Sequence, residues 1–170
     1  AREIVRRFNF TFGPTLVEPQ AKLTKVPRVV GIDGVNKMSK SLNNHIELAA
    51  TPEETRARVM TMVTDPARKR RSDPGNPEVC PVYDLHKVFT PKEERESYIV
   101  PGCTTAGIGC LECKAVVIDR LTEILQPYWK KRAEFEKNPE IVWDILEEGS
   151  RRAREVAQAT MTEVRTAVGF

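Results

Sequence analysis

Hydrophobic residues recur at helical spacing near both ends of the sequence. In the first segment they stand three or four residues apart and are followed by Gly13-Pro14: Ile4, Val5, Phe8 and Phe12. This pattern predicts a short helix that ends before Gly13. The last segment has the same period in Ala153, Val156, Ala157, Thr160, Met161, Val164 and Val168.

Capping signals predict several helices after residue 50. Thr51-Pro52-Glu53-Glu54 is a capping box with proline at the first helical position, and it predicts a helix to about Val63. Thr90-Pro91-Lys92-Glu93 repeats the same signal. Asn138 with Pro139 predicts the start of a further helix.

A second apolar stripe follows Cys113, at spacings of three and four residues: Val117, Ile118, Leu121, Ile124, Leu125 and Tyr128. We expect Pro127 to kink or end this helix, and Gly149 to end the next one so that Ser150 caps a last helix. Both stripes are typical of a buried face, so the second half is predicted to be an antiparallel helical bundle.

Two β-branched segments precede these helices. Thr15-Leu16-Val17 and the stretch from Arg28 to Ile32 are separated by Pro19 and Pro27. They predict strand ends that lead into a loop. The change to helical patterns indicates a domain boundary between about residues 43 and 51.

The composition is that of a globular protein, with 170 residues, 40% hydrophobic and 30% charged. No apolar run approaches the roughly 18 residues that span a bilayer, and the segment Ala1–Arg7 lacks the apolar block of a signal peptide. We therefore expect an intracellular protein without a membrane partner. The net charge of +3 is compatible with nucleic-acid binding but equally with other functions.

Lys37-Met38-Ser39-Lys40-Ser41 is the segment that points most directly to chemistry. When a carboxylate attacks the α-phosphate of ATP, negative charge builds on the departing pyrophosphate, and lysine ammonium groups with serine hydroxyls suit that charge. Gly31 and Gly34 give the preceding backbone freedom to move. Taken alone, the pentapeptide also fits a solvated basic loop.

The surroundings of this pentapeptide resemble the KMSKS motif of class I aminoacyl-tRNA synthetases in its tryptophan-specific form. Gly31-Ile32-Asp33-Gly34 precedes it and Leu42-Asn43-Asn44 follows it. The segments 2–9, Thr64-Asp65-Pro66 and 73–78 (Asp-Pro-Gly-Asn-Pro-Glu) are also similar to tryptophanyl-tRNA synthetases. The resemblance extends over essentially the whole chain.

This resemblance implies a tryptophan–tRNA ligase that uses ATP with Mg²⁺ and acts on tRNA(Trp). It implies that Lys40 contacts the phosphates, that Lys37, Ser39 and Ser41 position the loop and the triphosphate, and that Met38 packs the loop against its domain. The implied fold is mainly α: residues 1–46 would be the end of a Rossmann-like class I catalytic domain, and residues 47–170 an antiparallel α-helical anticodon-binding domain with the cysteine cluster.

Part of such an enzyme has no counterpart in the sequence. The only histidines are His45, to which we assign no chemistry, and His86, and neither lies in a HIGH motif. The family's tryptophan-binding residues and homodimer contacts would lie in the same N-terminal catalytic half. We therefore expect a cytoplasmic chain that is inactive alone. One alternative is an isolated tRNA-binding module whose cysteines hold a structural metal or cluster, without catalytic activity of its own. A weaker alternative is another class I synthetase.

Four cysteines, Cys80, Cys103, Cys110 and Cys113, are separated by 22, 6 and 2 residues. Cysteines two residues apart can hold one metal from a tight turn, and the glycines at 107 and 109 let the backbone bring Cys103 near. The spacing fits a structural zinc ion, a [4Fe-4S] cluster or four unligated thiols. A subset of tryptophanyl-tRNA synthetases carries a [4Fe-4S] cluster on this spacing near the anticodon-binding region, and the resemblance therefore implies a cluster with a structural or tRNA-orienting role.

Arg68-Lys69-Arg70-Arg71 is the densest basic run. It fits either a solvated face or contacts with RNA phosphates, and the resemblance favours RNA. Lys114 is a second candidate contact, whereas Arg151, Arg152 and Arg154 are typical of a helix surface.

Overall fold

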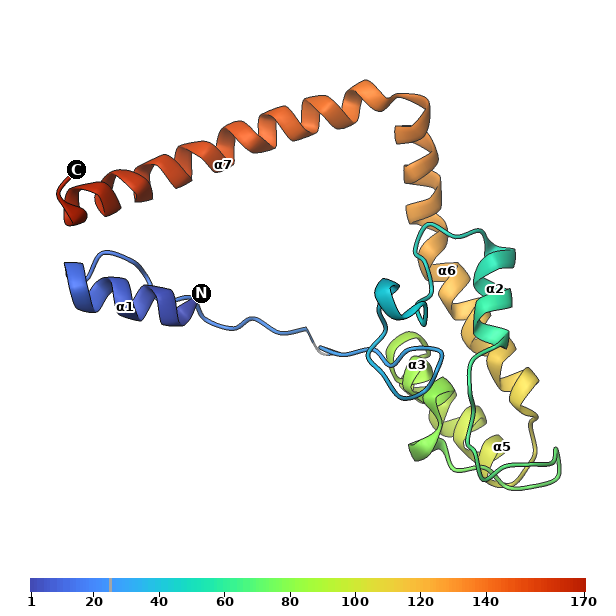
Figure 1. The fold of residues 1–170 in the computed structure, drawn as a ribbon. Helices are drawn as coiled ribbons and strands as arrows, with labels where there is room; N and C mark the ends of the chain where they lie inside the picture. The colour runs from blue at the N-terminus through green and yellow to red at the C-terminus, as the bar shows by residue number, and fades with distance from the viewer. Residues whose placement is uncertain (25) are drawn as a thin grey trace. The chain divides into compact units, whose positions relative to one another are not determined.

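The computed structural model describes residues 1–24 and 26–170, and every regular element in them is a helix (Figure 1). The α-helices are α1 (Arg2–Phe12), α2 (Pro52–Met60), α3 (Pro81–Phe89), α4 (Lys92–Glu94), α5 (Val100–Thr104), α6 (Cys110–Lys137) and α7 (Pro139–Val168). Two short 3₁₀ turns, η1 (Lys40–Leu42) and η2 (Pro77–Val79), and a π-helical segment, η3 (Arg95–Ile99), complete the set. None of the described helices is long and apolar enough to cross a membrane.

The expected end of a Rossmann-like domain is wrong for this chain. Neither Thr15-Leu16-Val17 nor the segment 28–32 forms a strand, and Val30 makes only an isolated antiparallel bridge with Lys37. Strand propensity largely measures how well a residue fits beside a partner strand. Within the described residues these β-branched segments have no such partner, so they remain extended loop.

The chain divides into two compact units. One unit contains Thr24–Lys131, and the other contains Ala1–Leu23 together with Arg132–Phe170. Our functional division between residues 46 and 47 is a different kind of boundary and stays a prediction.

The larger unit has its core where α2, α3 and α6 meet (Figure 1). Its buried residues are Val59, Met62, Val82, Leu85, Val117, Ile118, Leu121 and Leu125. The stripe after Cys113 is thus largely confirmed as core, although Ile124 and Tyr128 are exposed. Pro127 does not end its helix, because α6 continues to Lys137. The proline side chain lies on the exposed side of α6, where water can satisfy the carbonyl that it leaves unpaired.

The capping box at the start of α2 is confirmed. The Thr51 hydroxyl accepts from the Glu54 N–H at 3.2 Å, and the Glu54 carboxylate accepts from the Thr51 N–H at 2.8 Å. The similar signal at Thr90 behaves differently, because Thr90 is buried and its hydroxyl pairs with His86. The helix after it begins at Lys92 without a side-chain cap.

The smaller unit contains α1 and α7. Helix α1 ends at Phe12 before Gly13, as the sequence predicted, and Arg6 forms an ion pair with Glu18 at 2.6 Å. Helix α7 is continuous through Gly149 and Ser150, so the predicted break there is wrong. A glycine inside a helix costs only about 1 kcal/mol, which the long flanking segments tolerate.

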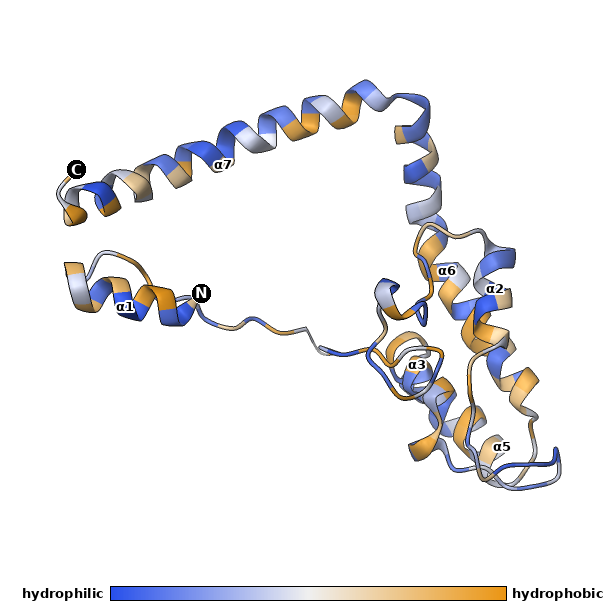
Figure 2. Cartoon of the chain, in the orientation of Figure 1, coloured by the Kyte–Doolittle hydropathy of each residue, from blue (hydrophilic) through white to orange (hydrophobic). Residues whose placement is uncertain are grey.

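The prediction that the C-terminal stripe is core is also wrong. No residue of α7 is buried, and Val156 is 72% exposed. Figure 2 shows hydrophobic residues alternating with hydrophilic ones along this helix. Helical periodicity identifies the face that a helix can bury, but burial requires a second surface.

Candidate functional site

Lys37–Ser41, which we call the KMSKS loop, belongs to a segment whose ends are tied together by the backbone. The Gly31 N–H donates to the Asn36 carbonyl at 2.8 Å, and the Met38 N–H donates to the Val29 carbonyl at 2.9 Å. Residues 40–42 then form the 3₁₀ turn η1, which ends at Asn43 with a φ of 49°. The loop therefore has a defined backbone rather than an extended one.

Asn44 holds the centre of this segment and is only 3% exposed. Its amide nitrogen donates to Asp33 at 2.8 Å and to the Lys37 carbonyl at 3.2 Å, and its oxygen accepts from the Ser39 N–H at 2.7 Å. Gly31 is required beside it, because a Cβ at that position would lie 2.2 Å from the Asn44 amide nitrogen. In the sequence Asn44 stands out only as part of a motif, since nothing local signals that a polar residue will be buried.

Asp33 completes this network. One carboxylate oxygen accepts from the backbone N–H groups of Val35 and Asn36 at 3.1 Å, and the other accepts from the Asn44 amide. These hydrogen bonds, the one from Val35 foremost, lower the pKa of Asp33 to about 2. Asp33 is therefore ionised at neutral pH and stabilises the turn that leads into the loop.

The lysines of the KMSKS loop face solvent. Lys37 is exposed, and the Lys40 side chain is 82% exposed with its ammonium group 3.8 Å from Glu47. The hydroxyls of Ser39 and Ser41 lie 2.9 Å apart, while Met38 is half-buried. The network thus fixes the backbone and leaves both ammonium groups accessible to an anionic ligand.

The end of the loop is fastened to α2 by Arg58. Its guanidinium group donates to the carbonyl and the side chain of Asn43 and, at 3.1 Å, to the His45 carbonyl. His45 itself pairs with Glu47 at 3.2 Å. A cavity of about 260 Å³ lies beside these residues.

The four cysteines converge although they come from three separate parts of the chain. Cys80 precedes α3, Cys103 lies in α5, and Cys110 and Cys113 lie in the first turn of α6. All four line one cavity of about 20 Å³, space for about one water molecule, together with Thr64, Asp65, Arg68 and Val82. Within residues 1–24 and 26–170, no group of three or more His, Cys, Asp or Glu side chains meets the geometry of a site for one metal ion.

The surroundings of the cysteines disfavour bare thiolates. Burial, and after it the three neighbouring thiols, raise the pKa of the Cys113 thiol to about 12. Burial also raises the pKa of Cys103, which Arg68 opposes. A thiolate in this cavity therefore needs a positive partner.

The segment between α2 and α3 frames this cavity. Buried Asp65 accepts from the backbone N–H groups of Ala67 and Asn76, each at 2.8 Å. The Gly75 N–H donates to the Cys103 carbonyl at 2.9 Å, and a Cβ at Gly75 would lie 2.7 Å from the Cys103 sulfur. The Thr-Asp-Pro and Asp-Pro-Gly-Asn-Pro strings thus hold the backbone around the cysteines.

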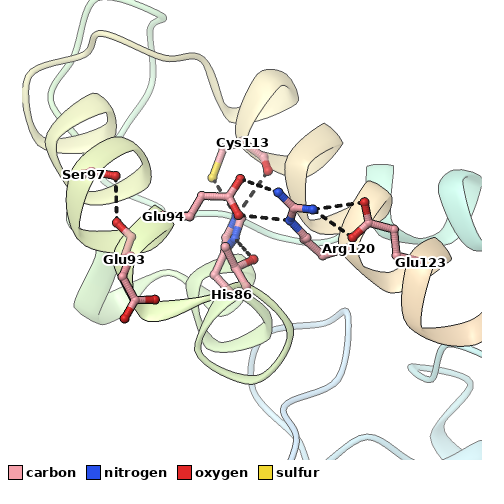
Figure 3. Close-up of polar contacts among 8 residues, drawn as sticks. His86, Glu93, Glu94, Ser97, Cys113, Arg120 and Glu123 are labelled. Atoms are coloured by element: carbon pink, nitrogen blue, oxygen red, sulfur yellow. Dashed lines mark hydrogen bonds and ion pairs between the residues drawn. The ribbon is translucent and has the colours of Figure 1, made fainter.

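His86 lies against Cys113 and is fully buried (Figure 3). Its Nε2 is 3.2 Å from the Cys113 carbonyl oxygen and 3.3 Å from the sulfur, while Nδ1 is 2.8 Å from the Thr90 hydroxyl. Because a carbonyl only accepts, Nε2 carries the proton and Nδ1 accepts from Thr90. Burial lowers the pKa of His86 to about 4, so the ring is neutral at neutral pH.

Arg120 connects α6 to Glu94, the last residue of α4 (Figure 3). It donates to both carboxylate oxygens of Glu94, at 3.0 and 3.1 Å, and to Glu123 at 2.8 Å.

Lys114, the second candidate RNA contact, is 5% exposed and donates to the Met60 carbonyl at 2.7 Å. This lysine holds the end of α2 and is not placed to meet a ligand.

Comparison with known proteins identifies the family. The family described as "tRNA synthetases class I (W and Y)" matches residues 1–126. The chain therefore belongs to the class I tRNA synthetases, in the family of the tryptophan and tyrosine enzymes.

The similar curated proteins are tryptophan–tRNA ligases. The Thermotoga maritima protein is 46% identical over 99% of this chain, and the Aquifex aeolicus protein is 45% identical over 100% of it. The chain spans about half the length of these relatives, 51% and 43% respectively. The tryptophanyl-tRNA synthetase of Campylobacter jejuni, solved with ADP and tryptophan, covers 99% of this chain with a TM-score of 0.78 and 25% identity, and the match covers 52% of that structure.

Proposed function

We propose that this chain is the C-terminal portion of a tryptophan–tRNA ligase and supplies its KMSKS loop and anticodon-binding region. The intact enzyme activates tryptophan with ATP and Mg²⁺ and transfers it to tRNA(Trp). The observation that carries this proposal is the loop itself: Asn44 and Asp33 fix its backbone while Lys37 and Lys40 remain exposed. The names of the most similar relatives support the choice of amino acid.

The loop residues have distinct tasks in this reaction. As the tryptophan carboxylate attacks the α-phosphate, charge grows on the departing pyrophosphate, and Lys40 and Lys37 donate to its oxygens. The 3.8 Å contact between Lys40 and Glu47 is weak and exposed, so the lysine exchanges it for a phosphate at little cost. Ser39 and Ser41 orient the triphosphate, and Met38 anchors the loop.

We assign residues 1–46 to the end of the catalytic domain and residues 47–170 to the anticodon-binding domain. The histidine motif and the tryptophan pocket belong to the half of the enzyme outside this chain, as do the homodimer contacts. We place the intact enzyme in the cytoplasm, where it serves protein synthesis. Light scattering of the intact enzyme tests the dimer.

A chimera tests the proposed activity. The N-terminal half of the Thermotoga maritima relative is joined to this chain, and tryptophan-dependent ATP–pyrophosphate exchange and charging of tRNA(Trp) are measured. We expect both activities in the chimera and neither in the chain alone. Exchange by the chain alone would show that it is not half of an active site.

The four cysteines are proposed to hold a [4Fe-4S] cluster. Four thiols, one just before α3, one in α5 and two in α6, line one cavity and provide the donor set that such a cluster takes, and Arg68 offsets part of its negative charge. When bound, the cluster supplies a cross-link between α3, α5 and α6. Iron with a broad absorbance near about 400 nm would support the cluster, whereas a colourless protein with zinc would favour the alternative of a structural zinc ion.

The alternative function is a tRNA-binding module without catalysis. It is favoured by the position of the basic run at the cysteine cavity, where Arg68 belongs to both. Binding of tRNA(Trp) by a chimera that cannot charge it would support this alternative.

A further inference from the structure

The basic run Arg68–Arg71 contains two kinds of cation. Arg68 is half-buried and donates to the Ile108 carbonyl at 2.8 Å and to the Arg71 carbonyl at 3.0 Å. Arg71 donates to the carbonyls of Ala106 and Gly107, the latter at 2.9 Å. These two arginines hold the turn between α5 and α6, so their charge is already engaged by the protein.

Lys69 and Arg70 are different. Both are exposed, and among the described residues neither side chain has a hydrogen bond or an ion pair. Their backbone is nevertheless fixed, because the Asp73 carboxylate accepts from the Lys69 N–H at 3.1 Å and from the Arg70 N–H at 2.7 Å. Two free cations thus project from a turn whose backbone is already fixed. Less conformational entropy of the backbone is therefore lost when the two side chains bind a ligand.

The run lines a cavity of about 420 Å³ together with Gly109 and the first three residues of α6, residues 110–112. In the described part of the chain, the backbone N–H groups of Cys110, Leu111 and Glu112 have no hydrogen-bond partner. These groups and the helix dipole favour an anion at this end of the 28-residue helix.

The one carboxylate that lines this cavity is already neutralised. Glu112 accepts from the Gly109 N–H and lies 3.2 Å from Arg71, and these contacts lower its pKa. It balances one of the four cations in the run and leaves the cavity positive.

We propose that Lys69 and Arg70, with the first turn of α6, form a binding site for the phosphodiester backbone of RNA. This rests on the proposed function, in which the RNA is tRNA(Trp). An exposed lysine and arginine contact phosphates without reading bases, so the site sets affinity and orientation and carries no sequence information. It lies directly beside Cys110, so RNA bound here approaches the proposed cluster.

The test compares two double variants of this chain. Lys69→Ala/Arg70→Ala removes the two free cations of the site. Arg56→Ala/Lys130→Ala removes the same two residue types from elsewhere on the larger unit, where both are exposed and have no described partner. Binding of a tRNA(Trp) transcript is titrated at several salt concentrations, and the melting temperature of each variant is recorded.

We expect the first variant to bind at least tenfold more weakly near 0.1 M salt. The slope of log Kd against log salt should fall by about 1.4 to 1.8, because each phosphate contact contributes roughly 0.7 to 0.9. The melting temperature should not change, since neither side chain has a hydrogen bond or an ion pair within the described residues. An unchanged affinity, or an equal loss in the control variant, would overturn the proposal.

Two further measurements separate this site from its alternatives. Inorganic phosphate that binds the wild-type chain while the transcript does not would show a small-anion site and overturn the RNA assignment. In the chimera, Lys69→Ala/Arg70→Ala should raise the KM for tRNA and leave ATP–pyrophosphate exchange unchanged. If the unmodified chimera fails in exchange while the chain still binds RNA through these residues, the proposed ligase function fails and the RNA site stands.

Discussion

The KMSKS loop and the Arg68–Arg71 run are both short basic segments, but the protein uses their charges differently. In the loop, uncharged Asn44 and the Asp33 carboxylate hold the backbone, and both lysines remain exposed. In the run, Asp73 holds the backbone, and Arg68 and Arg71 are engaged by carbonyls of a distant turn. A run of like charges therefore does not show which of its members can meet a ligand; the hydrogen-bond partners do.

The largest expected effect is that of a free cation in the loop. In the chimera, Lys40→Ala should reduce ATP–pyrophosphate exchange by about 100- to 1,000-fold, or roughly 2.7–4 kcal/mol, because a donor to the developing charge is lost. Binding of tRNA(Trp) and the melting temperature should stay the same. Lys22→Ala, which removes an exposed lysine outside the loop, is the control. If the Lys40→Ala chimera catalyses ATP–pyrophosphate exchange at the wild-type rate, Lys40 is not part of the ATP site.

The next effect concerns an engaged cation in the run. Arg68→Ala leaves the Ile108 and Arg71 carbonyls without their charged donor, so the free energy of unfolding should fall by about 3 kcal/mol. Urea denaturation measures this loss. Its neighbour Lys69 has no described partner, so Lys69→Ala should change the unfolding free energy by less than about 0.5 kcal/mol. If the two substitutions lower the unfolding free energy equally, Arg68 is not engaged by the protein more than Lys69 is.

A smaller loss is expected from the neutral residue that holds the loop. Asn44→Ala removes three hydrogen bonds and leaves the Ser39 N–H and the Lys37 carbonyl unpaired, at a cost of about 2 kcal/mol of unfolding free energy. The exposed Asn36 makes one side-chain hydrogen bond, to Asp33 at 3.2 Å, so Asn36→Ala is the matched control. If both variants unfold at the same urea concentration, Asn44 does not hold the loop.

The smallest effect is the pH dependence of the same network. The pKa of Asp33 is about 2 in the folded chain and 3.8 in its ordinary state, so folding favours the carboxylate. This stabilisation is complete above pH 3.8 and is lost as the pH falls toward 2. The difference in urea midpoint between wild type and Asp33→Asn should therefore shrink across this range. A constant difference would mean that Asp33 does not titrate as the network requires.

Local sequence signals predicted the elements whose stability is local. The capping box at Thr51 and Glu54 formed because both partners lie within one helical turn. The glycine and proline after Phe12 ended α1 for a similarly local reason. The stripe after Cys113 was also largely confirmed, but for a non-local reason: it is core because α2 and α3 cover it.

Two of the wrong predictions share a different cause. Segment 28–32 required a partner strand, and the stripe in α7 required a second apolar surface, which the described residues do not provide. The periodicity of a segment states what it can bury and not whether anything lies against it. The ends predicted at Pro127 and Gly149 were wrong because a long, otherwise regular helix tolerates one unfavourable residue.

The sequence by itself determined the starts of α2 and α7, the residues of the KMSKS loop, the spacing of the cysteines and the resemblance to tryptophanyl-tRNA synthetases. Tertiary structure alone decided that Asn44 is buried, that four cysteines share one cavity, and that Arg68 is engaged while Lys69 is free. The physical reason is distance along the chain. A cap finds its partner three residues away, whereas Arg68 finds the Ile108 carbonyl 40 residues away, and only the folded chain brings those two groups together.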